Sequence, residues 1–185
     1  MKKFIKSSLL AFTLITAVVM DGCDAFESFV FGLPVSVTIT TTGSTNPSGS
    51  ASFCLDTIQT YQDYADKLNS IVFVEAYFVT LSISSGDENL QGDGVLRLFA
   101  GNAPVGTPLF VHTKNDIKPA DYLSPNFYKI ELTPEEIAAI NAALKNNNSK
   151  CFYGDYEIIV EPGSAVSPYT IEVKIDMLYN IDANL

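Results

Sequence analysis

The chain has 185 residues, the length of a single domain, and 47% of them are hydrophobic, so it can bury a core. Its formal net charge is −10 at pH 7. This acidic balance argues against nucleic acid and against electrostatic docking on anionic lipid, because both need a basic patch.

The first 22 residues have the pattern of an export signal. Lys2, Lys3 and Lys6 give a positive start, and an apolar run of 12 residues, 9–20, follows them. Such a run is too short to span a bilayer, which takes roughly 20 residues. It has the length of the apolar core of a secretory signal. We therefore expect residues 1–22 to be a signal peptide that is removed.

The end of this signal resembles a lipobox, the motif of bacterial lipoproteins. Its residues are Met20-Asp21-Gly22-Cys23, and in that family a small residue precedes the cysteine that receives a diacylglyceryl group and becomes residue one. The resemblance implies that Cys23 is acylated, that residues 23–32 are the lipidated cysteine and a tether, and that the protein is anchored to a membrane of the cell envelope, in the periplasm or at the cell surface. The alternative is an ordinary secretory signal with a structural Cys23.

The three cysteines fit this anchor. Acylation of Cys23 leaves Cys54 and Cys151, an even pair in an oxidising compartment, and we expect them to form a disulfide. A metal site is the weaker alternative, because two lone cysteines and His112 do not have the spacing of zinc ligands.

Residues 33–185 have the pattern of an all-β domain. The tether Asp24–Gly32 is apolar, and it either lies in the lipid interface or already forms the first strand, since aromatic and β-branched residues suit strands. Alternating hydrophobic residues predict strands over 33–40, 71–83, 95–100, 107–111, 126–132, 152–160 and 170–181. The polar segment 41–52 is typical of a turn region. Short strands between turn signals predict an antiparallel β-sandwich of about seven to eight strands, immunoglobulin-like or jelly-roll-like.

Two short helices are predicted between the strands. Residues 56–59 (Asp-Thr-Ile-Gln) resemble a capping box, and apolar residues at helical spacing follow them as far as Leu68. Residues 133–136 (Thr-Pro-Glu-Glu) form a fuller capping box, with Pro in the first turn and Glu three residues after the Thr. We expect both helices to cover the ends or an edge of the sandwich.

The clearest candidate ligand site is the segment 87–94. Asp87, Asn89 and Asp93 place oxygen side chains at alternate positions, as in the first half of an EF-hand calcium loop, although Leu98 stands where that family has its bidentate Glu. The hypothesis is a Ca²⁺ site, and the alternative is a hairpin turn made of turn-forming residues. We expect no other cofactor.

We expect no catalytic residues. His112, the one histidine, is interpreted as a surface residue at the end of a short strand, and no Gly-x-Ser-x-Gly elbow accompanies it. Nothing in the sequence singles out one carboxylate pair for glycoside hydrolysis.

These patterns predict a cell-envelope lipoprotein with a non-catalytic binding or structural domain. Its expected partners are the lipid bilayer, through acylated Cys23, and an envelope protein or glycan, but not nucleic acid. The loops 84–94, 101–108 and 114–126 are the expected binding surfaces, because sandwiches commonly bind ligands through loops. The alternatives are calcium-dependent adhesion through residues 87–94 and a carboxylate-based hydrolase.

Overall fold

The fold is built almost entirely of strands. The computed structural model describes residues 28–43, 46–84, 88–146, 150–164 and 168–184, so the predicted signal and Cys23 lie outside the described residues. The main elements in chain order are β1 (Ser28–Gly43), β2 (Ser48–Cys54), α1 (Gln59–Gln62), β3 (Leu68–Ile83), β4 (Gly92–Ala100), β5 (Phe110–Ile117), β6 (Tyr128–Ile130), α2 (Pro134–Asn146), β7 (Cys151–Val160) and β8 (Tyr169–Asn184). In the part of the chain that is described, no helix has both the length and the apolar character that a membrane span requires.

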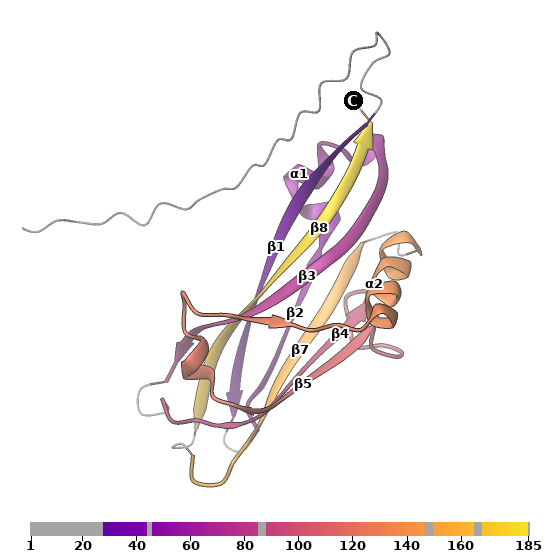
Figure 1. Cartoon of the computed structure of the whole chain (residues 1–185). Coiled ribbons are helices and arrows are strands. Elements are labelled where there is room, and N and C mark those ends of the chain that lie inside the picture. Colours follow the sequence, from indigo (N-terminus) through magenta and orange to yellow (C-terminus); the bar gives the residue numbers. More distant parts are fainter. Residues whose placement is uncertain (1–27, 44–45, 85–87, 147–149, 165–167, 185) are drawn as a thin grey trace, which may run out of the picture.

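The eight strands form one antiparallel sheet, which folds over into two four-stranded halves (Figure 1). The strand order is β5-β4-β7-β2-β1-β8-β3-β6, and the pair Thr42–Ser48 connects β1 to β2. We name β1-β8-β3-β6 sheet A and β5-β4-β7-β2 sheet B. Every connection except β4–β5 crosses from one sheet to the other, which is the jelly-roll arrangement. The predicted antiparallel β-sandwich is therefore confirmed, with eight strands and in the jelly-roll form.

The ladder between β1 and β8 shows where the domain begins. It runs unbroken from the pair Ser28–Asn184 to the pair Gly43–Tyr169. Residues 28–32 of the predicted tether are thus part of β1, which confirms the strand interpretation for them. The domain extends back at least to Ser28, and the predicted boundary at Leu33 is corrected accordingly.

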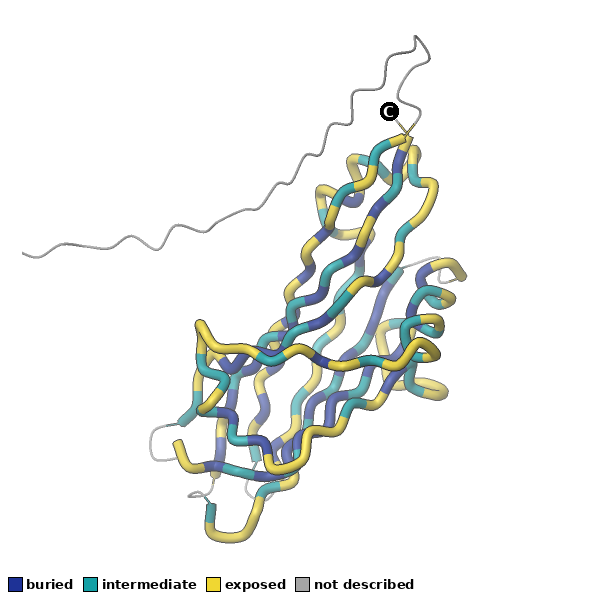
Figure 2. The backbone as a smooth tube through the Cα atoms, in the orientation of Figure 1, coloured by how far each residue is buried: buried dark blue, intermediate teal, exposed yellow. Residues whose placement is uncertain are grey.

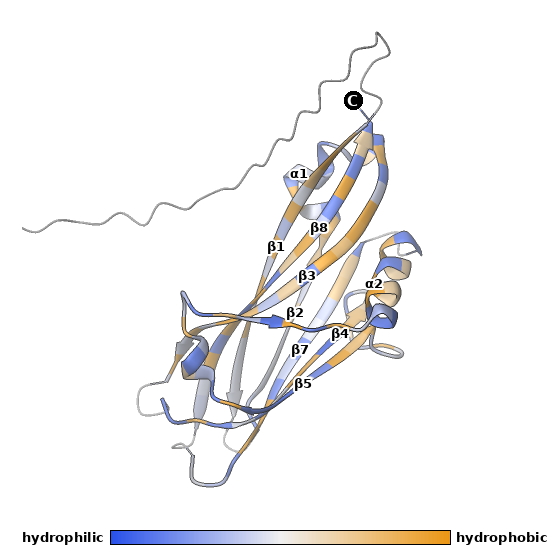
Figure 3. Cartoon of the chain, viewed as in Figure 1, coloured by the Kyte–Doolittle hydropathy of each residue, from blue (hydrophilic) through white to orange (hydrophobic). Residues whose placement is uncertain are grey.

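Alternation along β8 explains the core between the sheets. Ile171, Val173, Ile175, Met177 and Tyr179 point inward, and each is at most 6% exposed. The residues between them are half-buried or exposed, and Figures 2 and 3 show the alternation as bands along β8. Full burial of one such side chain contributes roughly 1.5–3 kcal/mol, so this register is strongly specified.

The strands of sheet A are longer than those of sheet B, and the helical segments cover the part of sheet A that extends past sheet B. Strands β1, β3 and β8 have 16 residues each, whereas those of sheet B have 7 to 10. Sheet A therefore extends past sheet B at the end that carries Ser28 and Asn184 (Figure 1). There the segment 55–67, with buried Leu55, and α2, with buried Ile140, complete the core.

The two predicted helices have different outcomes. At α2 the capping box is confirmed, since the Glu136 backbone N–H donates to Thr133 Oγ1 at 3.2 Å and the Thr133 N–H donates to Glu136 Oε2 at 2.8 Å. The first predicted helix is instead one α-turn between two short 3-10 turns. Ile58 is the N-cap of α1 and makes no side-chain cap bond, so the predicted cap at Asp56 is wrong.

Strand β2 was missed, because it lies largely within the predicted turn region 41–52. Its small polar residues give no hydrophobic alternation, but its backbone pairs with β7 along its whole length. Gly49 is required there, since a Cβ would lie 2.1 Å from the Thr40 carbonyl oxygen. The strand predicted at 107–111 is shifted in the structure to Phe110–Ile117, where it forms the edge of sheet B.

Candidate functional site

The outer face of sheet B carries a cluster of polar side chains that come from three adjacent strands. Strand register aligns residues of β2, β7 and β4 in three rows. In this strand order the rows are Ser48–Glu157–Val95, Ser50–Asp155–Arg97 and Ser52–Tyr153–Phe99. The alternate residues of β7, such as Phe152 and Tyr156, are buried on the opposite side of the strand. The strands thus fix a grid of side chains on one rigid surface.

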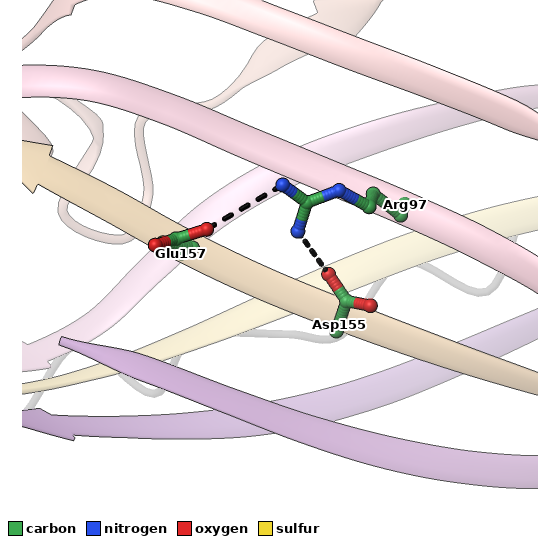
Figure 4. A network of polar contacts seen from close by, with 3 residues as sticks. All are labelled: Arg97, Asp155 and Glu157. Atoms are coloured by element: carbon green, nitrogen blue, oxygen red, sulfur yellow. Dashed lines mark hydrogen bonds and ion pairs between the residues drawn. The ribbon is translucent and has the colours of Figure 1, made fainter. Parts of the chain in front are cut away.

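Arg97 lies at the centre of this grid and binds two carboxylates of β7 (Figure 4). Its Nη1 lies 2.8 Å from Asp155 Oδ1, and its Nη2 lies 3.4 Å from Glu157 Oε2. The hydrogen bond to Asp155 is the main cause that raises the pKa of Arg97. The side chains of Arg97, Asp155 and Glu157 are 33%, 22% and 30% exposed, so the network reaches solvent.

An open hollow of about 470 Å³ lies over this network. Its lining residues are Ser48, Gly49, Ser50, Arg97, Tyr153, Asp155, Tyr156 and Glu157. The side chains offer hydroxyls, carboxylates, a guanidinium and a tyrosine ring, and the exposed lining is mainly polar. Chemically the arrangement can hold a ligand by hydrogen bonds.

The predicted disulfide is confirmed. Cys54 and Cys151 are bonded to each other and stand opposite one another at the end of the β2–β7 ladder. Among the described residues, Asp56 joins these two cysteines in a group whose potential ligand atoms lie within 4.8 Å of one another. Because both thiols are consumed in the disulfide, neither offers a metal the thiolate that it would bind.

The structure describes two of the three predicted calcium ligands, Asn89 and Asp93. Asp87 lies outside the described residues. Asn89 Oδ1 accepts a hydrogen bond from Lys118 Nζ at 3.5 Å, and Asp93 Oδ1 accepts one from the Asp116 backbone N–H at 3.1 Å. Asp93 also belongs to β4, so a strand begins inside the segment. The calcium site stays a prediction, and these contacts give Asn89 and Asp93 structural roles between β4 and β5.

His112 is not the surface strand-end residue that the sequence suggested. It lies inside β5 opposite Leu96 and is half-buried, with its ring centroid 6.0 Å from that of Tyr128. Burial is the main cause that lowers the pKa of His112. Its position between the sheets places it away from the residues that line the hollow.

Sequence reasoning missed the Arg97 network, because the expected binding surfaces were loops. One signal was available: Tyr153, Asp155 and Glu157 alternate within a predicted strand and so share a face. Their pairing with Arg97 depends on the register between β4 and β7, which has no local signal.

Comparison with known proteins gives no family assignment. No family model matches the chain, and no curated protein sequence matches it. Among solved structures, empty-head turnip yellow mosaic virus is 13% identical with a TM-score of 0.43, and the match covers 94% of this chain and 90% of that one. A structure of Desmodium yellow mottle tymovirus is 10% identical with a TM-score of 0.40, covering 92% and 97%. The decameric BFDV capsid protein is 9% identical with a TM-score of 0.40, covering 83% and 99%. We infer no function from these similarities.

Proposed function

We propose that this chain is a lipid-anchored, non-catalytic binding protein of the bacterial cell envelope, and that its jelly-roll domain binds a ligand on the outer face of sheet B. The observation that carries the binding role is the hollow above Arg97, whose lining comes from three adjacent strands. The lipobox resemblance at Cys23 supports the anchor. The Cys54–Cys151 disulfide is compatible with an oxidising compartment.

The arrangement of charges favours binding over hydrolysis. A carboxylate pair for acid–base catalysis needs one group that can deliver a proton while the other stays ionised. Here Arg97 binds both Asp155 and Glu157, so both carboxylates are engaged by the same cation. The one histidine lies between the sheets, outside the lining of the hollow.

The intact mass of the protein, purified from the membranes of a bacterium that expresses it, tests the anchor. We expect the mass of residues 23–185 plus acyl chains, and we expect Cys23→Ser to abolish acylation and release the protein from the membrane fraction. Two or more acyl chains hold a protein stably, whereas one holds it marginally. An unacylated wild-type protein, or a Cys23→Ser variant that stays membrane-bound, would contradict the lipoprotein proposal.

A further inference from the structure

The polar network under the hollow has unused hydrogen-bonding capacity. A guanidinium carries five N–H donors, and among the described residues Arg97 donates to Asp155 and Glu157 through two of them. A carboxylate has about four acceptor sites, and each of these carboxylates uses one for Arg97. The exposed hydroxyls of Ser48 and Ser50 stand beside them. The surface therefore presents donors and acceptors side by side.

Charge and lining restrict what this surface can hold. The guanidinium contributes one positive charge and the two carboxylates two negative charges, so the network is net −1 on a chain whose net charge is −10. A phosphate or sulfate would be repelled by both carboxylates. A cationic side chain would be attracted by the net charge, but Arg97 already occupies both carboxylates and would repel it. The polar lining gives an apolar ligand little surface to contact. A neutral ligand with many hydroxyl groups meets neither repulsion, and each of its hydroxyls can donate and accept.

An aromatic ring completes the surface. Tyr153 lines the hollow, and its ring packs edge-on against Phe99 with 6.2 Å between centroids. Phe99 pairs with Tyr153 on the neighbouring strand and is only 7% exposed, so it supports the tyrosine ring from the side. An aromatic face beside hydrogen-bonding groups suits a sugar ring, which has an apolar C–H face and a polar hydroxyl rim.

The side chains that line the hollow are held in place by paired strands before any ligand binds. They come from β2, β7 and β4, which pair over Ser48–Cys54 with Cys151–Glu157 and over Gly92–Ala100 with Phe152–Val160. The disulfide joins two of these strands. Sites on rigid strands lose little conformational entropy when a ligand binds.

From these observations we infer that the hollow over Ser48, Ser50, Arg97, Tyr153, Asp155 and Glu157 is a carbohydrate-binding site that takes a neutral, polyhydroxylated ligand. The inference rests on the proposed binding role of this face and names its ligand class. It does not depend on the acylation of Cys23.

Titration of the full mature protein tests the inference. The protein is kept in a detergent without a sugar headgroup, and the probes are neutral oligosaccharides of glucose, mannose, galactose and N-acetylglucosamine, followed by isothermal calorimetry. Inorganic phosphate and trilysine represent the anionic and cationic classes. We expect at least one oligosaccharide to bind with a millimolar or tighter Kd, and neither charged probe to bind in the hollow. Co-sedimentation with insoluble cell-wall glycan then distinguishes an envelope source from dissolved sugar.

Two variants and a matched control locate the binding. Arg97→Ala removes the central donor, and we expect it to weaken oligosaccharide binding at least tenfold, since charge-assisted hydrogen bonds are the strong ones. Ser50→Tyr keeps the network and fills the hollow, so it should also abolish binding. Lys174→Ala breaks a comparable ion pair, Lys174–Asp176 at 2.8 Å, on β8 in the other sheet, and should leave binding unchanged.

The outcomes separate this inference from the anchor. No oligosaccharide binding, or binding of phosphate or trilysine in its place, would overturn the ligand class. Oligosaccharide binding that survives both Arg97→Ala and Ser50→Tyr would overturn the assignment of the site to the hollow. An unacylated protein that binds oligosaccharide through Arg97 would overturn only the anchor, whereas an acylated protein that binds no sugar would overturn only the carbohydrate site.

Discussion

Removing the disulfide should cost much of the stability of this domain. The double variant Cys54→Ala/Cys151→Ala opens a loop that the disulfide closes over a sequence separation of 97 residues. The chain-entropy model gives about 4.7 kcal/mol for a loop of this size. The two residues stand at the end of a ladder that pairs Ser48–Cys54 with Cys151–Glu157, so strand pairing persists without the covalent link. The loss therefore arises mainly from the added freedom of the unfolded chain.

Urea unfolding followed by far-UV circular dichroism measures this loss. The chain has no Trp, so the backbone signal is the more direct probe. With an m-value of about 2 kcal/mol/M, the transition midpoint should fall by roughly 2 M. Reductant should bring the wild-type protein to the same midpoint and leave the double variant unchanged. A loss below about 1 kcal/mol would refute the loop-entropy reasoning.

Three further changes test the core, the helix cap and the half-buried His112. Phe78→Ala should lower the free energy of unfolding by about 3–5 kcal/mol, because Phe78 is fully buried and its ring stacks 5.0 Å from Tyr128; a loss under 1.5 kcal/mol in urea would contradict that packing. Thr133→Ala should cost about 1 kcal/mol by removing the acceptor for the Glu136 N–H, and Thr133→Ser should restore it. Burial lowers the pKa of His112 below its unfolded value of about 6.5, so its contribution to stability is complete above that pH and is lost as pH falls through the folded pKa. His112→Gln should therefore reduce the loss of stability between pH 7.5 and pH 5, and an unchanged pH dependence in urea titrations would count against the burial.

The elements with strong local signals were predictable from the sequence. Strand β8 alternates without interruption, so its buried residues Ile171 to Ile181 could be assigned to one face before any partner strand was known. The start of α2 was equally clear, because the capping box at Thr133 depends only on residues close in sequence. In both cases local preference and tertiary structure agree.

The elements that depend on distant partners were not predictable. Strand β2 has a run of small polar residues, and it is a strand because β7 pairs with it and Gly49 fits closely against β1. The segment after Cys54 has hydrophobic residues at helical spacing. Its Leu55 and Tyr61 are buried in the core against sheet A, and the segment forms only one α-turn. Tertiary packing decides both cases.

One part of the candidate site could be predicted from the sequence, and the other could not. The shared face of Tyr153, Asp155 and Glu157 follows from alternation alone, whereas the approach of Arg97 requires strands 58 residues apart in sequence to meet in one register. Loops were the expected binding surfaces because loops usually carry function. The network instead lies on the sheet, where strands hold side chains more rigidly than loops do.

The length of β1 sets a height for the binding surface if Cys23 is acylated. Five residue steps separate Cys23 from Ser28, which is at most about 18 Å of extended chain. The 16 residues of β1 then rise about 50 Å, and the hollow lies near the far end, where Thr42 pairs with Ser48. With β1 perpendicular to the membrane, the long strands of sheet A would hold the hollow over Arg97 well above the lipid headgroups. The hollow could then bind glycan located at that height, whereas a ligand at the bilayer surface would be too far from it to bind.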